Sequence, residues 1–86
     1  MNVDYTKLFN RQFEKLPREH QIQAKDAVEL FLDDVAAPSL RNHALKGKWV
    51  GYRSISAGSD LRLHFKMIGT DTVLFVAVGG HSQLYR

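Results

Sequence analysis

Cysteine is absent from the 86-residue chain. Disulfide bridges, thiolate zinc sites and cysteine nucleophiles are therefore excluded. No apolar run approaches the ~20 residues that a transmembrane helix needs. The opening segment MNVDYTKLFNRQF also lacks the apolar core of a signal peptide. We therefore expect a cytoplasmic protein with no membrane partner, folded as a single domain over residues 1–86.

Positive charge is concentrated in the middle of the chain. The formal net charge is +3, but residues 41–66 carry six basic side chains against Asp60 alone, a local balance of +5. The remaining residues sum to −2. A basic cluster of this kind attracts polyanions, of which nucleic acid is the commonest. Chance clustering on a solvated face is the alternative reading of the charge pattern.

The first half of the chain predicts a short strand at 2–5 followed by two helices. Thr6 can cap the first helix, because its hydroxyl can accept a hydrogen bond from an amide in the first turn. Pro17 suits the first turn of the second helix, which we expect to end at Pro38. The first helix is marked by apolar residues at helical spacing: Leu8, Phe9, Phe13 and Leu16. The apolar face of the second helix comprises Ala24, Ala27, Val28, Phe31 and Val35.

The second half predicts three strands. Residues 61–67 alternate between apolar and polar side chains, and 73–78 form a continuous apolar run that indicates a strand buried on both faces. Residues 49–56 are the expected partner strand, and Gly79 and Gly80 are expected to break the last strand. In the alternating strand, the side chains expected toward the core are Leu61, Leu63, Phe65 and Met67. Those expected outward are Asp60, Arg62, His64 and Lys66. The fold class is α+β, with the short strand and the helical pair packed on a small, mostly antiparallel sheet.

Three of the four histidines accompany the basic cluster in the second half. A histidine can donate or accept a proton near neutral pH, and arginine binds phosphate oxygens and stabilises their growing negative charge. RNA carries its own nucleophile, the 2′-OH. Such side chains could therefore cleave RNA to a 2′,3′-cyclic phosphate and a 5′-OH without a metal, and would spare DNA.

Some of the candidate residues also have interpretations that involve no catalysis. His20 and His64 are interpreted as ordinary surface histidines. A metal site built from histidines and Asp60 is not expected, because no pair has the close spacing of known ligand motifs. Tyr85 could stack on a base, bond a phosphate or simply pack against the protein.

The segment HALKGKWVGYR, residues 43–53, resembles the signature H-x-L-x-G-x-W-x-G-Y-R of the YafQ branch of the RelE/ParE toxin superfamily. Asp60-Leu61-Arg62 resembles the acidic start of the family's third strand, and GGHSQLY at 79–85 resembles its glycine–histidine–aromatic tail. The resemblance implies a RelE-like fold and a toxin of a type II toxin–antitoxin pair. It also implies an endoribonuclease that cleaves mRNA in the ribosomal A site without metal or cofactor. The implied partners are a cognate antitoxin, the ribosome and mRNA.

By position, the resemblance also implies a role for each site residue. His81 is implied as general acid or base, and His43 as a group that assists proton transfer or holds phosphate. Asp60 would orient a histidine or the 2′-OH, Arg62 would bind the scissile phosphate, and Tyr85 would stack on an mRNA base. The implied phosphate-binding residues are Arg53, Lys46, Lys48 and Lys66.

The chain departs from the family pattern at two positions. Ser56 stands where the family often has a further histidine, and Leu61 where it tends to have an aromatic residue. Two alternatives therefore stay open. One is a ParE-like toxin that poisons DNA gyrase and needs no acid–base histidine. The other is a decayed toxin that only binds its antitoxin.

Overall fold

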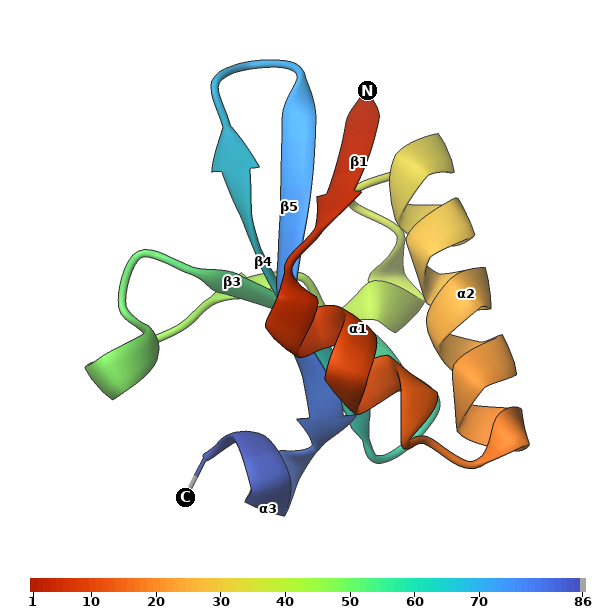
Figure 1. Cartoon of the computed structure of the whole chain (residues 1–86). Coiled ribbons are helices and arrows are strands. Elements are labelled where there is room, and N and C mark those ends of the chain that lie inside the picture. Colours follow the sequence, from red (N-terminus) through yellow and green to blue (C-terminus); the bar gives the residue numbers. More distant parts are fainter. Residues whose placement is uncertain (86) are drawn as a thin grey trace.

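Within residues 1–85, which the computed structural model describes, five strands form one sheet in the order β1-β5-β4-β3-β2 (Figure 1). β1 runs parallel to β5, and the other neighbouring strands pair antiparallel. The strands are β1 (Asn2–Tyr5), β2 (His43–Ala44), β3 (Arg53–Ala57), β4 (Leu61–Ile68) and β5 (Thr72–Gly80). The expected α+β class with a mostly antiparallel sheet is confirmed.

Two helices, α1 and α2, pack against one face of the sheet (Figure 1). We call this the helical face; it carries Leu63, Phe65 and Phe75. Phe31 of α2 meets Phe65 edge-on, with ring centroids 4.9 Å apart, and Phe9 of α1 lies 6.0 Å from Phe75. The helices are α1 (Lys7–Glu14), α2 (Arg18–Asp33) and a short α3 (His81–Leu84) after β5; the 3₁₀ turns are η1 (Pro38–Leu40) and η2 (Gly47–Trp49). The predicted helical pair is therefore confirmed.

Thr6 caps α1 as its position predicts. Its Oγ1 accepts a hydrogen bond from the N–H of Phe9 at 3.1 Å and donates one to the carbonyl of Val76 at 3.0 Å. The first contact satisfies an amide that the helix itself leaves unpaired. The second ties the start of α1 to β5.

A β-bulge interrupts the ladder between β4 and β5. His64 pairs with Ala77 and Phe65 pairs with Phe75, so Val76 is an extra residue in β5. Phe75 therefore packs under the helices, whereas Ala77 lies on the opposite face in a separate small apolar cluster. The prediction that this strand is buried on both faces is confirmed.

Two predicted core positions are wrong. Met67 is 40% exposed because β3 pairs with β4 only as far as Phe65, which leaves Met67 on a free edge. Val35 is exposed because α2 ends at Asp33. Asp34 takes an extended conformation there, and its side chain accepts the N–H of Ala36, which turns the chain away from the helix.

Two predicted strand boundaries are also wrong. Residues 49–52 form a turn, because Gly47 and Gly51 take left-handed φ angles of 66° and 93° that a strand does not allow. Gly79 and Gly80 do not break β5; they pair with β4 as ladder residues. A Cβ on Gly79 would lie 2.7 Å from Oε1 of Gln83, so the Gln83 side chain of α3 packs directly on this strand residue.

Candidate active site

A row of paired residues crosses the sheet on the face opposite α1 and α2. His43 of β2 pairs with Ser54, Ser54 pairs with His64, and His64 pairs with Ala77 of β5. Directly paired residues point to the same face of a sheet. We call it the second face; Arg62, two residues before His64, lies on it as well. Sheet pairing thus brings together a basic residue and two histidines that are separated along the chain.

His64 is not the surface residue that the alternation predicted. Its side chain is 0% exposed, because the rings of Trp49 and Tyr85 cover it at centroid distances of 4.5 and 5.3 Å. Burial lowers its pKa from 6.5 to about 4, since it penalises the charged form, and the charge of His43 adds to the effect. His64 is therefore a neutral imidazole at physiological pH.

Residues 81–85 fold over the same face. α3 places His81 and Tyr85 four residues apart, so their rings meet at 4.4 Å. Trp49 holds this segment: its Nε1–H donates to the carbonyl of Leu84 at 2.9 Å, and Leu84 is buried. The expectations for this segment did not include a helix. The helix begins after Gly80, whose N–H donates a hydrogen bond to Oε1 of Gln83 at 2.9 Å.

Contacts between rings connect His81 to Tyr85, Tyr85 to His64 and His64 to Trp49. These four residues are called the ring cluster below. His81 and Tyr85 form its exposed end, and His64 lies beneath them. An exposed imidazole beside a phenol is an arrangement that can transfer protons to a bound substrate.

His43 presents one ring nitrogen to solvent. Its Nδ1 lies 2.7 Å from the carbonyl oxygen of Arg41. A carbonyl can only accept, so Nδ1 carries the hydrogen and the neutral ring leaves Nε2 with a free lone pair. Because His43 is exposed, that nitrogen is available as a proton acceptor.

Cationic groups surround the ring cluster. Arg62 is half-buried on the second face, and its Nη1 donates to the carbonyl of Leu61 at 3.0 Å. Lys66 places Nζ 5.4 Å from the ring centre of Tyr52, which in turn meets Trp49 edge-on at 5.6 Å. Lys46 and Lys48 are exposed at the turn that carries Trp49. A polyanion on this face would meet several cations.

Two predicted site residues lie elsewhere. Arg53 pairs with Phe65 and so lies on the helical face, where its Nε donates to Oδ1 of Asn42 at 2.9 Å. Asp60 lines a polar cleft of about 520 Å³ between the α1–α2 turn and α3, together with His20. Its carboxylate lies beside Gly80, so it is close to the backbone that carries His81 without belonging to the ring cluster.

Sequence reasoning missed His64 and undervalued Trp49. The sequence did contain a signal that His64 is buried. If β5 is buried on both of its faces, then a side chain of β4 that lies beside either face of β5 should be buried as well. The covering groups were also visible, because Trp49, Tyr52 and Tyr85 had no place in the helical core. Combining these two facts predicts a buried histidine under aromatic rings.

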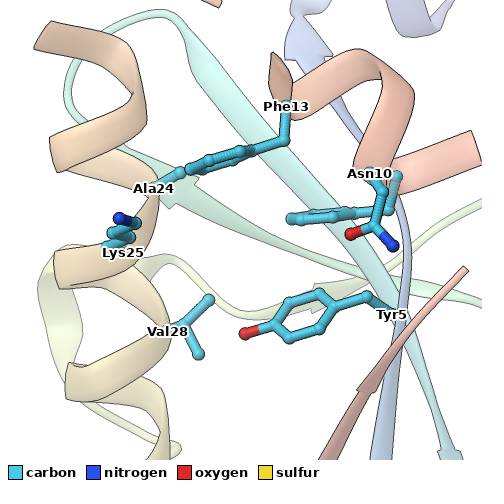
Figure 2. Close-up of a pocket in the computed structure, with 7 residues that line it drawn as sticks. Tyr5, Asn10, Phe13, Ala24, Lys25 and Val28 are labelled. Atoms are coloured by element: carbon cyan, nitrogen blue, oxygen red, sulfur yellow. The ribbon is translucent and has the colours of Figure 1, made fainter. Parts of the chain in front are cut away.

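A separate groove of about 210 Å³ opens on the helical side, where α1, α2 and β1 meet. Figure 2 shows the rings of Tyr5 and Phe13 pointing across it toward Val28 and Ala24 of α2, with Lys25 at the side. Burial raises the pKa of Tyr5 above its usual value of 10.0. The groove lies away from the second face and holds apolar side chains rather than acid–base groups.

Among residues 1–85, no three histidine or acidic side chains group closely enough to hold a metal ion. Over the same range, no helix is long and apolar enough to cross a membrane.

The hydrogen bond from Trp49 predicts how firmly α3 is attached. In Trp49→Phe the aromatic packing is largely kept but the donor to Leu84 is lost. We expect the free energy of unfolding to fall by about 1–2 kcal/mol, measured by urea denaturation. Amide exchange at Leu84 and Tyr85 should accelerate more than in β4. Unchanged exchange at the end of the chain would show that this bond does not hold α3.

Comparison with known proteins agrees with this architecture. Residues 1–86 match the family described as bacterial toxin of type II toxin–antitoxin system, YafQ. No curated protein sequence matches the chain significantly. YafQ from E. coli strain BL21(DE3) has a TM-score of 0.83 at 19% identity, over 99% of this chain and 98% of that one.

Two further solved structures share the fold. YafQ in the E. coli DinJ–YafQ toxin–antitoxin complex has a TM-score of 0.80 at 20% identity, over 99% of this chain and 97% of that one. A copper-bound mutant toxin from Helicobacter pylori has a TM-score of 0.76 at 25% identity, over 99% of both chains. Because the family match spans the whole chain and the fold agrees, this protein belongs to the YafQ family of bacterial type II toxin–antitoxin toxins.

Proposed function

We propose that this toxin is a ribosome-dependent endoribonuclease that cleaves mRNA in the A site and so inhibits translation. The observation that carries the proposal is that His81, Tyr85, His43 and Arg62 lie on the same face of the sheet. This set provides proton-transfer groups and a phosphate-binding cation, as intramolecular attack by the 2′-OH requires. The activity places the toxin in the cytoplasm, where ribosomes are.

The two exposed histidines share the proton transfers. The Nε2 lone pair of His43 suits removal of a proton from the 2′-OH, and His81 in its protonated form suits donation of its own proton to the leaving 5′-oxygen. Either histidine can take either role. Arg62 faces the same side and stabilises the charge that develops on the phosphorane. Tyr85 contacts a base or a phosphate at the exposed end of the ring cluster.

The remaining predicted residues take supporting roles. Asp60 lies beside Gly80, so we propose that it supports the segment carrying His81. Arg53 lies on the other face and would contact phosphates of the ribosome outside the reaction centre. The three lysines of the phosphate-binding set hold the RNA backbone electrostatically: Lys46, Lys48 and Lys66.

A cognate antitoxin is the proposed protein partner. One of the similar solved structures is E. coli YafQ in complex with the DinJ antitoxin, and the YafQ chain in it has the same fold as this protein. We propose that binding of such a partner holds this toxin inactive. We therefore expect co-expression with the antitoxin to relieve growth inhibition by this chain.

Primer extension on mRNA in a purified translation system tests the function. We expect discrete cuts within codons that require both ribosomes and this protein, with 2′,3′-cyclic phosphate ends. The matched control omits ribosomes and should leave the mRNA intact. An absence of cuts from folded protein would refute the proposal. Inhibition of gyrase supercoiling in its place would establish the ParE-like alternative.

A further inference from the structure

The proposed chemistry makes no use of His64, although it lies directly beneath Tyr85. Its Nε2 lies 3.2 Å from the hydroxyl oxygen of Tyr85. Its other nitrogen, Nδ1, is buried and has no hydrogen-bond partner among residues 1–85. The ring is fixed between Trp49 and Tyr85, so it has little freedom to find another partner. A buried polar group of this kind calls for a physical reason.

The unpartnered nitrogen indicates which tautomer the ring adopts. A neutral imidazole carries one hydrogen, on Nδ1 or on Nε2. A hydrogen on Nδ1 would leave a buried N–H unpaired, which is rarer in proteins than an under-used acceptor. A hydrogen on Nε2 is donated to Tyr85, and only a lone pair remains unpaired at Nδ1. His64 is therefore expected as the Nε2–H tautomer.

This tautomer determines what Tyr85 can do. The phenol oxygen accepts the hydrogen bond from His64, so its own O–H is left to donate to another group. Tyr85 is 36% exposed at the surface of the second face, and its ring contacts that of His81. Its O–H is thus available to an acceptor bound beside His81. An RNA phosphate oxygen is an acceptor of this kind.

We propose that His64 is a positioning residue that holds the Tyr85 hydroxyl as a hydrogen-bond donor to a phosphate oxygen of the RNA substrate. The proposal rests on the proposed function, because that function supplies the phosphate. Of the base and phosphate contacts open to Tyr85, it selects the phosphate contact, which depends on the hydroxyl. His64 itself does not touch the RNA; it acts through Tyr85.

A set of three variants tests the coupling. His64→Leu keeps an apolar volume but removes the donor, His64→Gln places an amide N–H near the position of Nε2, and Tyr85→Phe removes the hydroxyl. We expect His64→Leu and Tyr85→Phe each to lower kcat about tenfold, the value of one hydrogen bond, with KM for ribosome-bound mRNA nearly unchanged. His64→Gln should retain most of the rate.

The double variant His64→Leu/Tyr85→Phe separates coupling from general damage. If His64 acts only through the hydroxyl, the double variant is no slower than either single variant. Multiplied losses would overturn the proposal, and so would a His64→Gln variant as slow as His64→Leu. Circular dichroism and thermal unfolding show whether each variant is folded. If His64→Leu does not fold, the cleavage rates of His64→Gln and Tyr85→Phe still test the proposal, because it expects a nearly normal rate for the first and a tenfold loss for the second.

A measurement on the free protein needs no activity. Nitrogen-15 NMR of the imidazole distinguishes a protonated ring nitrogen from a bare one. We expect Nε2 of His64 to be protonated and Nδ1 to be bare at neutral pH. The opposite tautomer would overturn the inference even if the toxin cleaves mRNA. The expected tautomer in a protein that does not cleave would instead place the failure in the proposed function.

Discussion

His81→Ala should abolish mRNA cleavage while leaving the fold intact. Proton transfer by a positioned side chain typically contributes about 10²–10⁴-fold to a rate, and we expect a loss of that size in the ribosome-dependent assay. His81 is exposed, and its ring contact is with Tyr85, so its removal should change the free energy of unfolding by no more than about 0.5 kcal/mol. Primer extension and urea denaturation measure the two effects.

His20→Ala is the matched control for this loss. His20 lies on α2 and lines the cleft beside Asp60, and it is not part of the ring cluster. The His20→Ala variant should cleave mRNA like the wild type, which would exclude a general effect of losing a histidine. Cuts that persist in His81→Ala would contradict the role of His81 and move the search for the proton-transfer groups to His43 and Arg62.

Acid should destabilise the wild-type protein more than His64→Leu. The pKa of His64 is about 4 in the folded protein and 6.5 in the unfolded chain. Between these values the unfolded chain binds a proton that the folded protein does not, so stability falls as pH falls. Each pKa unit is worth about 1.4 kcal/mol, and we therefore expect His64 to contribute a loss of about 3 kcal/mol between pH 7 and pH 4.

The His64→Leu variant isolates that contribution. Carboxylates titrate in the same range, but they are common to both proteins. The groups that share the second face with His64 are His43, His81, Tyr85, Arg62 and Lys66, and they too are common to both proteins. Urea denaturation at several pH values should show a steeper decline for the wild type below pH 6.5. Parallel declines would mean that His64 is protonated as readily in the fold as in the unfolded chain.

Local patterns were sufficient for most of the fold. The Thr6 cap, the spacing of Phe9 and the strand over residues 61–67 each depend on neighbouring residues, and each prediction was confirmed. The wrong predictions share a different cause. Met67 is exposed because a partner strand ends early, and His64 is buried because residues far along the chain fold over it. Alternation within one strand contains neither fact.

The candidate site was also predicted only in part from the sequence. Family resemblance located His43, His81, Arg62 and Tyr85, and sheet pairing and α3 place all four on the second face. Their roles remain predictions. Resemblance did not predict His64, because the signature segments do not include that position. Its importance follows from burial and from the bond to Tyr85, which only the three-dimensional arrangement reveals.

The extra residue at Val76 sets the phase of everything that follows it in β5. Side chains in a regular strand alternate with a period of two, but Phe75 and Val78 both face the helices although they are three positions apart, because the bulge absorbs Val76. If the same residues formed a regular strand, Val78 would pair with Arg62 and turn away from the helices, and the backbone leading into His81 would emerge with the opposite orientation. The location of a reactive histidine thus depends on the bulge, whereas deletion of Val76 would remove the bulge and keep the pairing on both sides of it.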